Sequence, residues 1–175
     1  MDNKSINDLL NANYDQLVIW SESHGIRNWT SGPKNKWTGG QHVLHLVQST
    51  KPLLKGISMP KFLLKYKFGK CNRPIRSYEE VVKNYHNKLS KVVAVSPFSQ
   101  NMPETSLSTM PSHLEALKSL NNKLSKTTLK LKDKHLDVCL LPHPLMGRMT
   151  LREILIWNAY HLKHHTDILN EKYTK

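Results

Sequence analysis

The sequence is poor in cysteine, in glycine and proline, and in long apolar runs. Cys71 and Cys139 are its only cysteines and form no C-x-x-C pair, so neither a disulfide framework nor a cysteine zinc site is expected. No apolar run exceeds four residues, far short of the ~20 that a membrane-spanning helix needs. Seven glycines and nine prolines among 175 residues are too few for a fibrous or disordered protein.

The length and the apolar content of the chain fit one folded domain. Apolar residues make up 38% of the chain, enough to build a single core over residues 1–175. The first ten residues, MDNKSINDLL, have no basic region followed by an apolar stretch, so they do not resemble a secretory signal. We therefore expect a cytoplasmic protein with no membrane partner.

Acidic residues are also scarce, with 13 Asp and Glu against 26 Lys and Arg. The stretch from Lys51 to Lys91 holds eleven basic residues and two acids, which is +9 of the net charge of +13. Such a field can attract an anionic ligand, a nucleic acid or an acidic surface, and it can equally be a solvated face.

Helical signals recur along the chain. Capping boxes, in which a Ser or Thr is followed three residues later by Glu or Gln, occur four times. They are Thr38 with Gln41, Ser77 with Glu80, Ser112 with Glu115, and Thr150 with Glu153. Apolar spacing adds an earlier helix, which we expect Gly25 to end. The predicted helices span roughly residues 5–24, 38–55, 77–94, 112–131 and 150–172.

No segment alternates apolar and polar residues over a sustained run, so the sequence predicts an all-α protein. The four longer helices most simply form a bundle, with the short helix 77–94 in a long connection packed on its side.

The last predicted helix carries two inward histidines. His161 and His165 fall on the apolar stripe one turn apart, so both rings can reach a single ion near the bundle axis. Packing explains a lone inward histidine, because one or two hydrogen bonds satisfy a neutral ring. Two at this spacing leave a metal site and ordinary packing as alternatives, and a third ligand is needed to decide between them.

The helix 38–55 offers two candidates for that ligand, His42 and His45. Its apolar stripe places His42 nearer the core and His45 further round, so periodicity alone favours His42. Small residues on the other side, Gly39 and Ser49, would let a neighbouring helix approach the face that carries both histidines.

These residues resemble the DinB superfamily, the DinB/YfiT-like proteins described as metalloenzymes. The resemblance rests on Trp37-Thr38 followed by His45-Leu46, on Tyr160-His161 with His164-His165, and on the stretch LPHPLMGRMTLREILIWNAYHLKHH. It implies an antiparallel four-helix bundle that holds one divalent ion through His45, His161 and His165. His42 then becomes a neighbour of the site.

An ion held by three imidazoles acts as a Lewis acid, and zinc or nickel suits such ligands. It can activate a low-molecular-weight thiol as thiolate or a water as hydroxide. Characterised members of the family are thiol S-transferases, and others are described as hydrolases. No Asp or Glu falls on the core face beside His161 or His165, and Glu153 is expected to be occupied in its cap, so we favour thiol transfer.

The remaining alternative is a basic binding protein without enzymatic activity, with a structural ion or none. The basic stretch shows no nucleic-acid-binding signature, so we expect a small, anionic substrate rather than nucleic acid. The family resemblance also allows a homodimer.

Other candidate residues have simpler explanations. His143 lies between two prolines, where a rigid turn explains it. Trp157 lies one turn before His161 and either forms a wall of the pocket or only packs. The other histidines lie near predicted helix ends, where capping or solvent suffices: His24, His86, His113 and His135.

Overall fold

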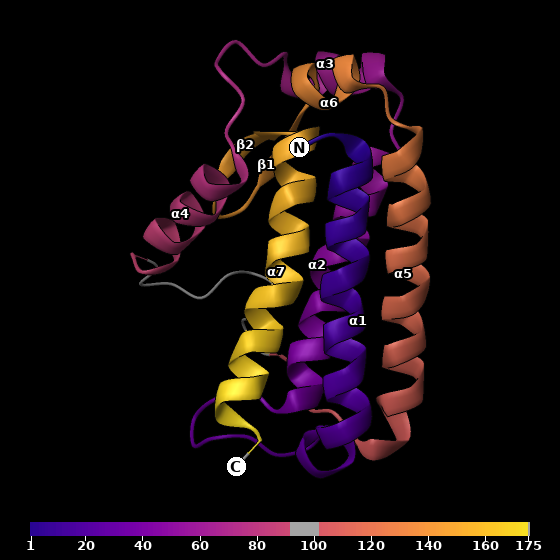
Figure 1. Cartoon of the computed structure of the whole chain (residues 1–175), viewed down its shortest axis with the longest axis vertical. Helices are drawn as coiled ribbons and strands as arrows, with labels where there is room; N and C mark the ends of the chain where they lie inside the picture. The colour runs from indigo at the N-terminus through magenta and orange to yellow at the C-terminus, as the bar shows by residue number, and fades with distance from the viewer. Residues whose placement is uncertain (92–101, 175) are drawn as a thin grey trace.

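The computed structural model describes residues 1–91 and 102–174, and most of this part of the chain is helical (Figure 1). The elements in chain order are α1 (Asn3–Asn28), α2 (Gly39–Ile57), α3 (Lys61–Phe68), α4 (Tyr78–Leu89), η1 (Leu107–Thr109), α5 (Met110–Lys130), α6 (Asp133–Val138), β1 (Leu140–His143), β2 (Gly147–Thr150) and α7 (Leu151–Lys172). The largely helical class predicted from the sequence is confirmed. Among the described residues, no helix has the length and apolarity needed to cross a bilayer.

The four longest helices, α1, α2, α5 and α7, lie side by side along the long axis of the molecule (Figure 1). Helix α1 packs against α7 and α5, and α2 packs against α5 and α7. Helices α1 and α7 run in one direction, and α2 and α5 run in the other. Helices α3 and α6 both lie at the same end of the molecule, and α4 packs on the outer side of α7.

The core is apolar and aromatic, and it includes side chains of α3, α6 and β2 as well as of the long helices. Its largest fully buried side chains are Trp20, Trp29, Ile6, Leu10, Leu17, Leu46, Ile57, Leu64, Leu124, Leu136, Met149 and Leu151. Burying a side chain of this size stabilises the fold by ~1.5–3 kcal/mol relative to exposure.

Three of the four predicted capping boxes are present. Thr38, Ser77 and Thr150 each cap a helix, and the residue three positions later returns the hydrogen bond to the cap backbone. Each such cap contributes about 1 kcal/mol to helix stability, and the caps of α2 and α7 fix where these two helices begin.

The box predicted at Ser112 is wrong, because α5 begins two residues earlier, at Met110. Pro111 lies in the first turn of α5, where its fixed φ favours helix initiation and its missing N–H costs nothing. The Ser112 hydroxyl donates instead to the carbonyl of Thr109 at 2.8 Å.

The predicted stop at Gly25 is also wrong, since α1 continues to Asn28. A Cβ at Gly25 would lie 2.7 Å from the terminal methyl of Met110, so this glycine serves the approach of α5 to α1. The short helix predicted over 77–94 ends earlier, at Leu89, and positions 92–94 lie outside the described residues.

The sequence did not predict α3, α6 or the hairpin of β1 and β2. In the hairpin, Leu140 pairs with Thr150 and His143 with Gly147, antiparallel. Each strand has only four residues, too few to show a period of two. The hairpin leads directly into α7, so it fixes the position of the helix that carries His161 and His165.

Candidate metal centre

Helix α2 buries both of its histidines. Their exposed fractions are 6% for His42 and 8% for His45, so the apolar stripe did not distinguish them correctly. A Cβ at Gly39 would lie 2.8 Å from the backbone oxygen of Asn28, so the end of α1 closely approaches the first turn of α2. His45 itself is covered by Trp37, His161 and His165, whose ring centroids lie 5.0, 5.1 and 4.9 Å from its own.

Helix α7 presents His161 and His165 one turn apart, with exposed fractions of 3% and 5%. Both side chains point inward, as the sequence predicted. The hydrogen bond from the side-chain amide of Asn13 to the Ala159 carbonyl, at 2.8 Å, ties α1 to α7 just before this turn.

The rings of His45, His161 and His165 converge. His161 Nε2 lies 3.2 Å from His45 Nε2 and 3.0 Å from His165 Nε2. One ligand nitrogen from each ring lies within 4.8 Å of the other two, and all three residues are buried. A tetrahedral zinc ion with Zn–N bonds of ~2.0–2.1 Å holds its nitrogens ~3.3 Å apart, close to these spacings. The residues present therefore fit a divalent ion.

His42 lies outside this group of three. Its Nδ1 is 2.8 Å from Nδ1 of His165, on the side of that ring opposite Nε2, and its own Nε2 is 3.2 Å from the hydroxyl oxygen of Tyr173. The structure thus places His42 next to the three-histidine group, as the family resemblance implied and periodicity did not.

The imidazoles of His161 and His165 are neutral near pH 7. Burial lowers the pKa of His161 and His165 well below 6.5, and nearby imidazoles lower the pKa further. Burial also lowers the pKa of His42, to about 3. A neutral imidazole keeps the lone pair that a metal ion requires, so burial leaves His161 and His165 able to act as ligands.

Two tryptophans line the site. The Trp157 ring stacks on His161, with centroids 4.6 Å apart and planes at 22°, so the predicted neighbour of His161 is in contact with it. Trp37, just before the cap of α2, lies 5.0 Å from the His45 ring and parallel to the His165 ring at 6.2 Å. Trp37 was part of the resemblance, but the sequence assigned it no role.

Helix α4 adds an aromatic layer beyond α7. The Tyr85 ring lies 6.2 Å from that of His161 and 5.5 Å from that of His164. Burial raises the pKa of Tyr85 to about 12, so its phenol stays protonated. His86 is exposed in the last turn of α4, as expected, and its Nε2 also lies 2.5 Å from the hydroxyl oxygen of Tyr160.

The remaining histidines lie outside the group. His143 accepts hydrogen bonds from the backbone N–H groups of Leu145 and Met146 at 3.1 and 3.0 Å, which confirms its structural explanation in a turn. The His24 and His113 rings stack on Trp20 and Trp29.

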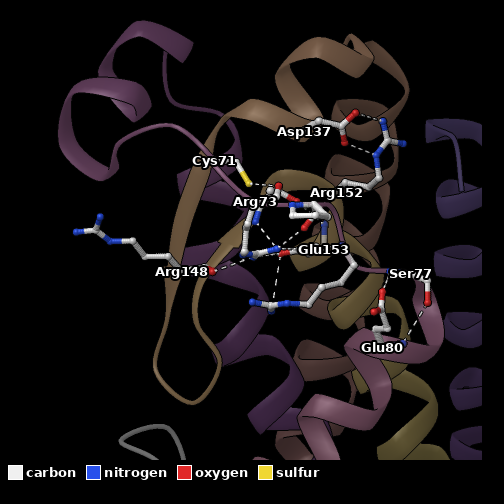
Figure 2. A network of polar contacts seen from close by, with 11 residues as sticks. Cys71, Arg73, Ser77, Glu80, Asp137, Arg148, Arg152 and Glu153 are labelled. Carbon is white, nitrogen blue, oxygen red and sulfur yellow. Dashed lines mark hydrogen bonds and ion pairs between the residues drawn. The ribbon is translucent and has the colours of Figure 1, made fainter.

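Within the described residues, the group of three includes no carboxylate. Glu153 is fully buried but is committed elsewhere, since Arg73 donates to both of its oxygens at 2.6 and 2.7 Å (Figure 2). Its burial raises the carboxyl pKa, but the Arg73 bonds and the backbone N–H donors of Arg76 and Thr150 outweigh burial and lower that pKa overall. Glu153 is thus an ionised cap, as expected, while the pairing with Arg73 was not predicted.

The comparisons with known proteins give one match. The model of the DinB superfamily matches residues 12–169. No curated protein matches the chain. No solved structure matches it either.

Proposed function

Because the chain belongs to the DinB superfamily and buries three converging histidines, we propose that it is a divalent-metal-dependent enzyme. His45, His161 and His165 are the ligands, and the convergence of their ring nitrogens is the observation that carries the proposal. Helices α1, α2, α5 and α7 correspond to the antiparallel four-helix bundle of the family. Zinc or nickel suits three imidazoles best.

A bound divalent ion supplies Lewis acidity, which lowers the pKa of a thiol or water that reaches it. The protein's own residues supply the ligands and exclude bulk water. Burial keeps His161 and His165 neutral, so neither ring repels a divalent cation. Trp37 and Trp157 cover two sides of the group, so they exclude bulk water and offer flat apolar faces to a substrate.

The reaction that these residues support best is thiol S-transfer. A low-molecular-weight thiol loses its proton to solvent water, and its sulfur forms a bond to an electrophilic carbon. The bond between that carbon and the leaving group breaks, and the leaving group departs with the electron pair. Hydrolysis generally needs a base beside the ion to take a proton from water, and the one fully buried carboxylate of the described residues, Glu153, is held by Arg73. A metal-dependent hydrolase is therefore the second candidate.

The surplus of positive charge favours an anionic thiol or substrate. The net charge is +13, and Lys172 is close enough to lower the pKa of His42 and His164 further. The homodimer and the cytoplasmic location remain predictions.

An assay with zinc-loaded or nickel-loaded protein tests the activity. We expect the protein to accelerate the consumption of at least one low-molecular-weight thiol by an alkylating electrophile, with loss of the acceleration in His165→Ala and after chelation. Hydrolysis of esters or amides without thiol consumption would support the second candidate. Nucleic-acid binding whose affinity falls with salt, in a protein without bound metal, would contradict both.

A further inference from the structure

A chain of hydrogen bonds ends on the three-histidine group. It begins at the backbone carbonyl of Trp37, which accepts from the hydroxyl of Tyr173. A carbonyl can only accept and a tyrosine hydroxyl has one proton, so that proton is committed to Trp37. Tyr173 is 4% exposed, which leaves little room for water to compete.

The position of the Tyr173 proton determines the direction of the hydrogen bond between Tyr173 and His42. Nε2 of His42 lies 3.2 Å from the Tyr173 oxygen. Because the hydroxyl proton already points at Trp37, the oxygen accepts and His42 Nε2 carries the hydrogen. His42 is buried, and the contacts of its two ring nitrogens are with Tyr173 and His165, neither of them a carboxylate, so its ring is neutral and Nδ1 has a free lone pair.

The same argument determines which ring nitrogen of His165 carries the hydrogen. Nδ1 of His42 and Nδ1 of His165 are 2.8 Å apart, and one of them must carry the hydrogen. His42 Nδ1 is the acceptor, so His165 Nδ1 donates. In a neutral imidazole the other nitrogen then bears the lone pair, and Nε2 of His165 is the atom that faces His161 at 3.0 Å.

We propose that Tyr173 and His42 are positioning residues that hold His165 in its Nδ1–H tautomer, so that its Nε2 lone pair faces a divalent cation shared with His45 and His161. This inference rests on the proposed metal site and explains a histidine that the site itself leaves unused. Ligating histidines usually donate their second N–H to a carboxylate, a carbonyl or water. Here the neutral ring of His42 accepts this N–H from His165 and donates its own N–H to Tyr173. His165 is therefore oriented without any added negative charge.

Substitutions of the two positioning residues separate this role from direct ligation. Tyr173→Phe removes the acceptor of His42 and keeps the ring that packs against Trp20. His42→Phe removes the acceptor of His165. His42→Gln keeps a side-chain carbonyl that can accept from His165 Nδ1–H, so it should restore what His42→Phe loses.

The measurement is zinc affinity by competition with a chromophoric chelator, with the absorption spectrum of the cobalt-substituted protein as a second readout. We expect affinity to fall ~10-fold in Tyr173→Phe and ~10–100-fold in His42→Phe, and to recover in His42→Gln. The cobalt spectrum should keep its shape in all three, because the ligands are unchanged. Tyr160→Phe is the matched control, since it removes a hydroxyl bonded to His86, outside the group, and should leave affinity unchanged.

Nitrogen-15 NMR of the metal-free protein reads the tautomer directly, and thermal unfolding checks that each variant folds. We expect His165 protonated at Nδ1 in the wild type and a mixture of tautomers in Tyr173→Phe. His165 protonated at Nε2 in the wild type would overturn the proposal, as would affinities within twofold of wild type in both Tyr173→Phe and His42→Phe. Failure of the wild type to bind zinc or cobalt would instead overturn the metal site, and with it any role of these residues toward a cation.

Discussion

His45 and His161 bring their Nε2 atoms to within 3.2 Å of each other, although 116 positions separate them in the sequence. The contact joins α2 to α7 through two buried imidazole rings. A cation bound there would tie together two helices that the unfolded chain leaves apart. Metal binding at this point would therefore be coupled to folding of the protein.

Zinc should therefore stabilise the folded state. At a free concentration 100-fold above its dissociation constant, a ligand that binds only the folded state adds about 2.7 kcal/mol. We expect the midpoint of thermal unfolding to rise when zinc is added to chelator-treated protein. His45→Ala should show no such rise, and an equal rise in that variant would mean that zinc binds elsewhere.

Loss of Arg73 should destabilise the protein through Glu153. Arg73 is bonded to both oxygens of this buried carboxylate (Figure 2), and Arg73→Ala leaves the charge with the backbone donors and the more distant Arg76 at 3.9 Å. We expect the free energy of unfolding to fall by about 3 kcal/mol, measured by urea denaturation.

Two controls identify the cause. Arg148→Ala removes an exposed side chain nearby and should change the free energy of unfolding by less than about 0.5 kcal/mol. In the Arg73→Ala background, Glu153→Gln removes the unpaired charge and should recover part of the loss. A double variant less stable than Arg73→Ala alone would show that Arg73 stabilises through packing rather than charge.

Two helical glycines should respond oppositely to alanine. At Gly40 a Cβ would lie 2.5 Å from Thr105 Oγ1 and 2.7 Å from the Trp29 carbonyl oxygen, which cannot easily move, so Gly40→Ala should cost about 2 kcal/mol. At Gly25 the obstacle is the flexible end of Met110, and Gly25→Ala should gain about 0.5–1 kcal/mol of helix propensity. Denaturation midpoints of the pair test this, and equal destabilisation of both would contradict it.

Acid should destabilise the protein partly through His143. Burial lowers its folded-state pKa to about 4, whereas the unfolded chain takes up the proton near pH 6.5. Stability is therefore unaffected by this group above about pH 6.5 and is lost as pH falls from there toward 4. His143 should account for about 2 kcal/mol between pH 7 and pH 5.

The variant His143→Asn isolates this contribution. Its side-chain oxygen can still accept from the N–H groups of Leu145 and Met146, but it does not titrate. The free energy of unfolding of this variant should depend less steeply on pH over the same range. Identical pH dependence in the two proteins would rule out His143 as a source.

Local signals predicted the helices well. The boxes at Thr38, Ser77 and Thr150 depend only on residues three positions apart, and each cap forms in the structure. The predictions at Gly25 and Ser112 were wrong because contacts with another helix, or a proline, determine where the helix ends or begins at these two positions. The sequence indicates a stop at Gly25, but this glycine lies inside a continuing helix, where the flexible end of Met110 from α5 approaches it.

The site was predictable in part. His161 and His165 follow from the stripe of α7, while His45 followed from the family resemblance and not from periodicity. The burial of His45 depends on how α7 and Trp37 cover α2, which no apolar stripe on α2 alone can predict. Tyr173 and Arg73 act on residues 131 and 80 positions away, and no local pattern marks such partners.

The most direct test of the account is the metal content of the protein purified without chelator, measured by elemental analysis beside His45→Ala, His161→Ala and His165→Ala. The account predicts about one zinc or nickel ion per wild-type chain and none in any folded variant, because three imidazoles are the minimum for such a site. Full occupancy in a single one of these variants, or a wild-type chain that stays metal-free even after incubation with zinc or nickel, would contradict it.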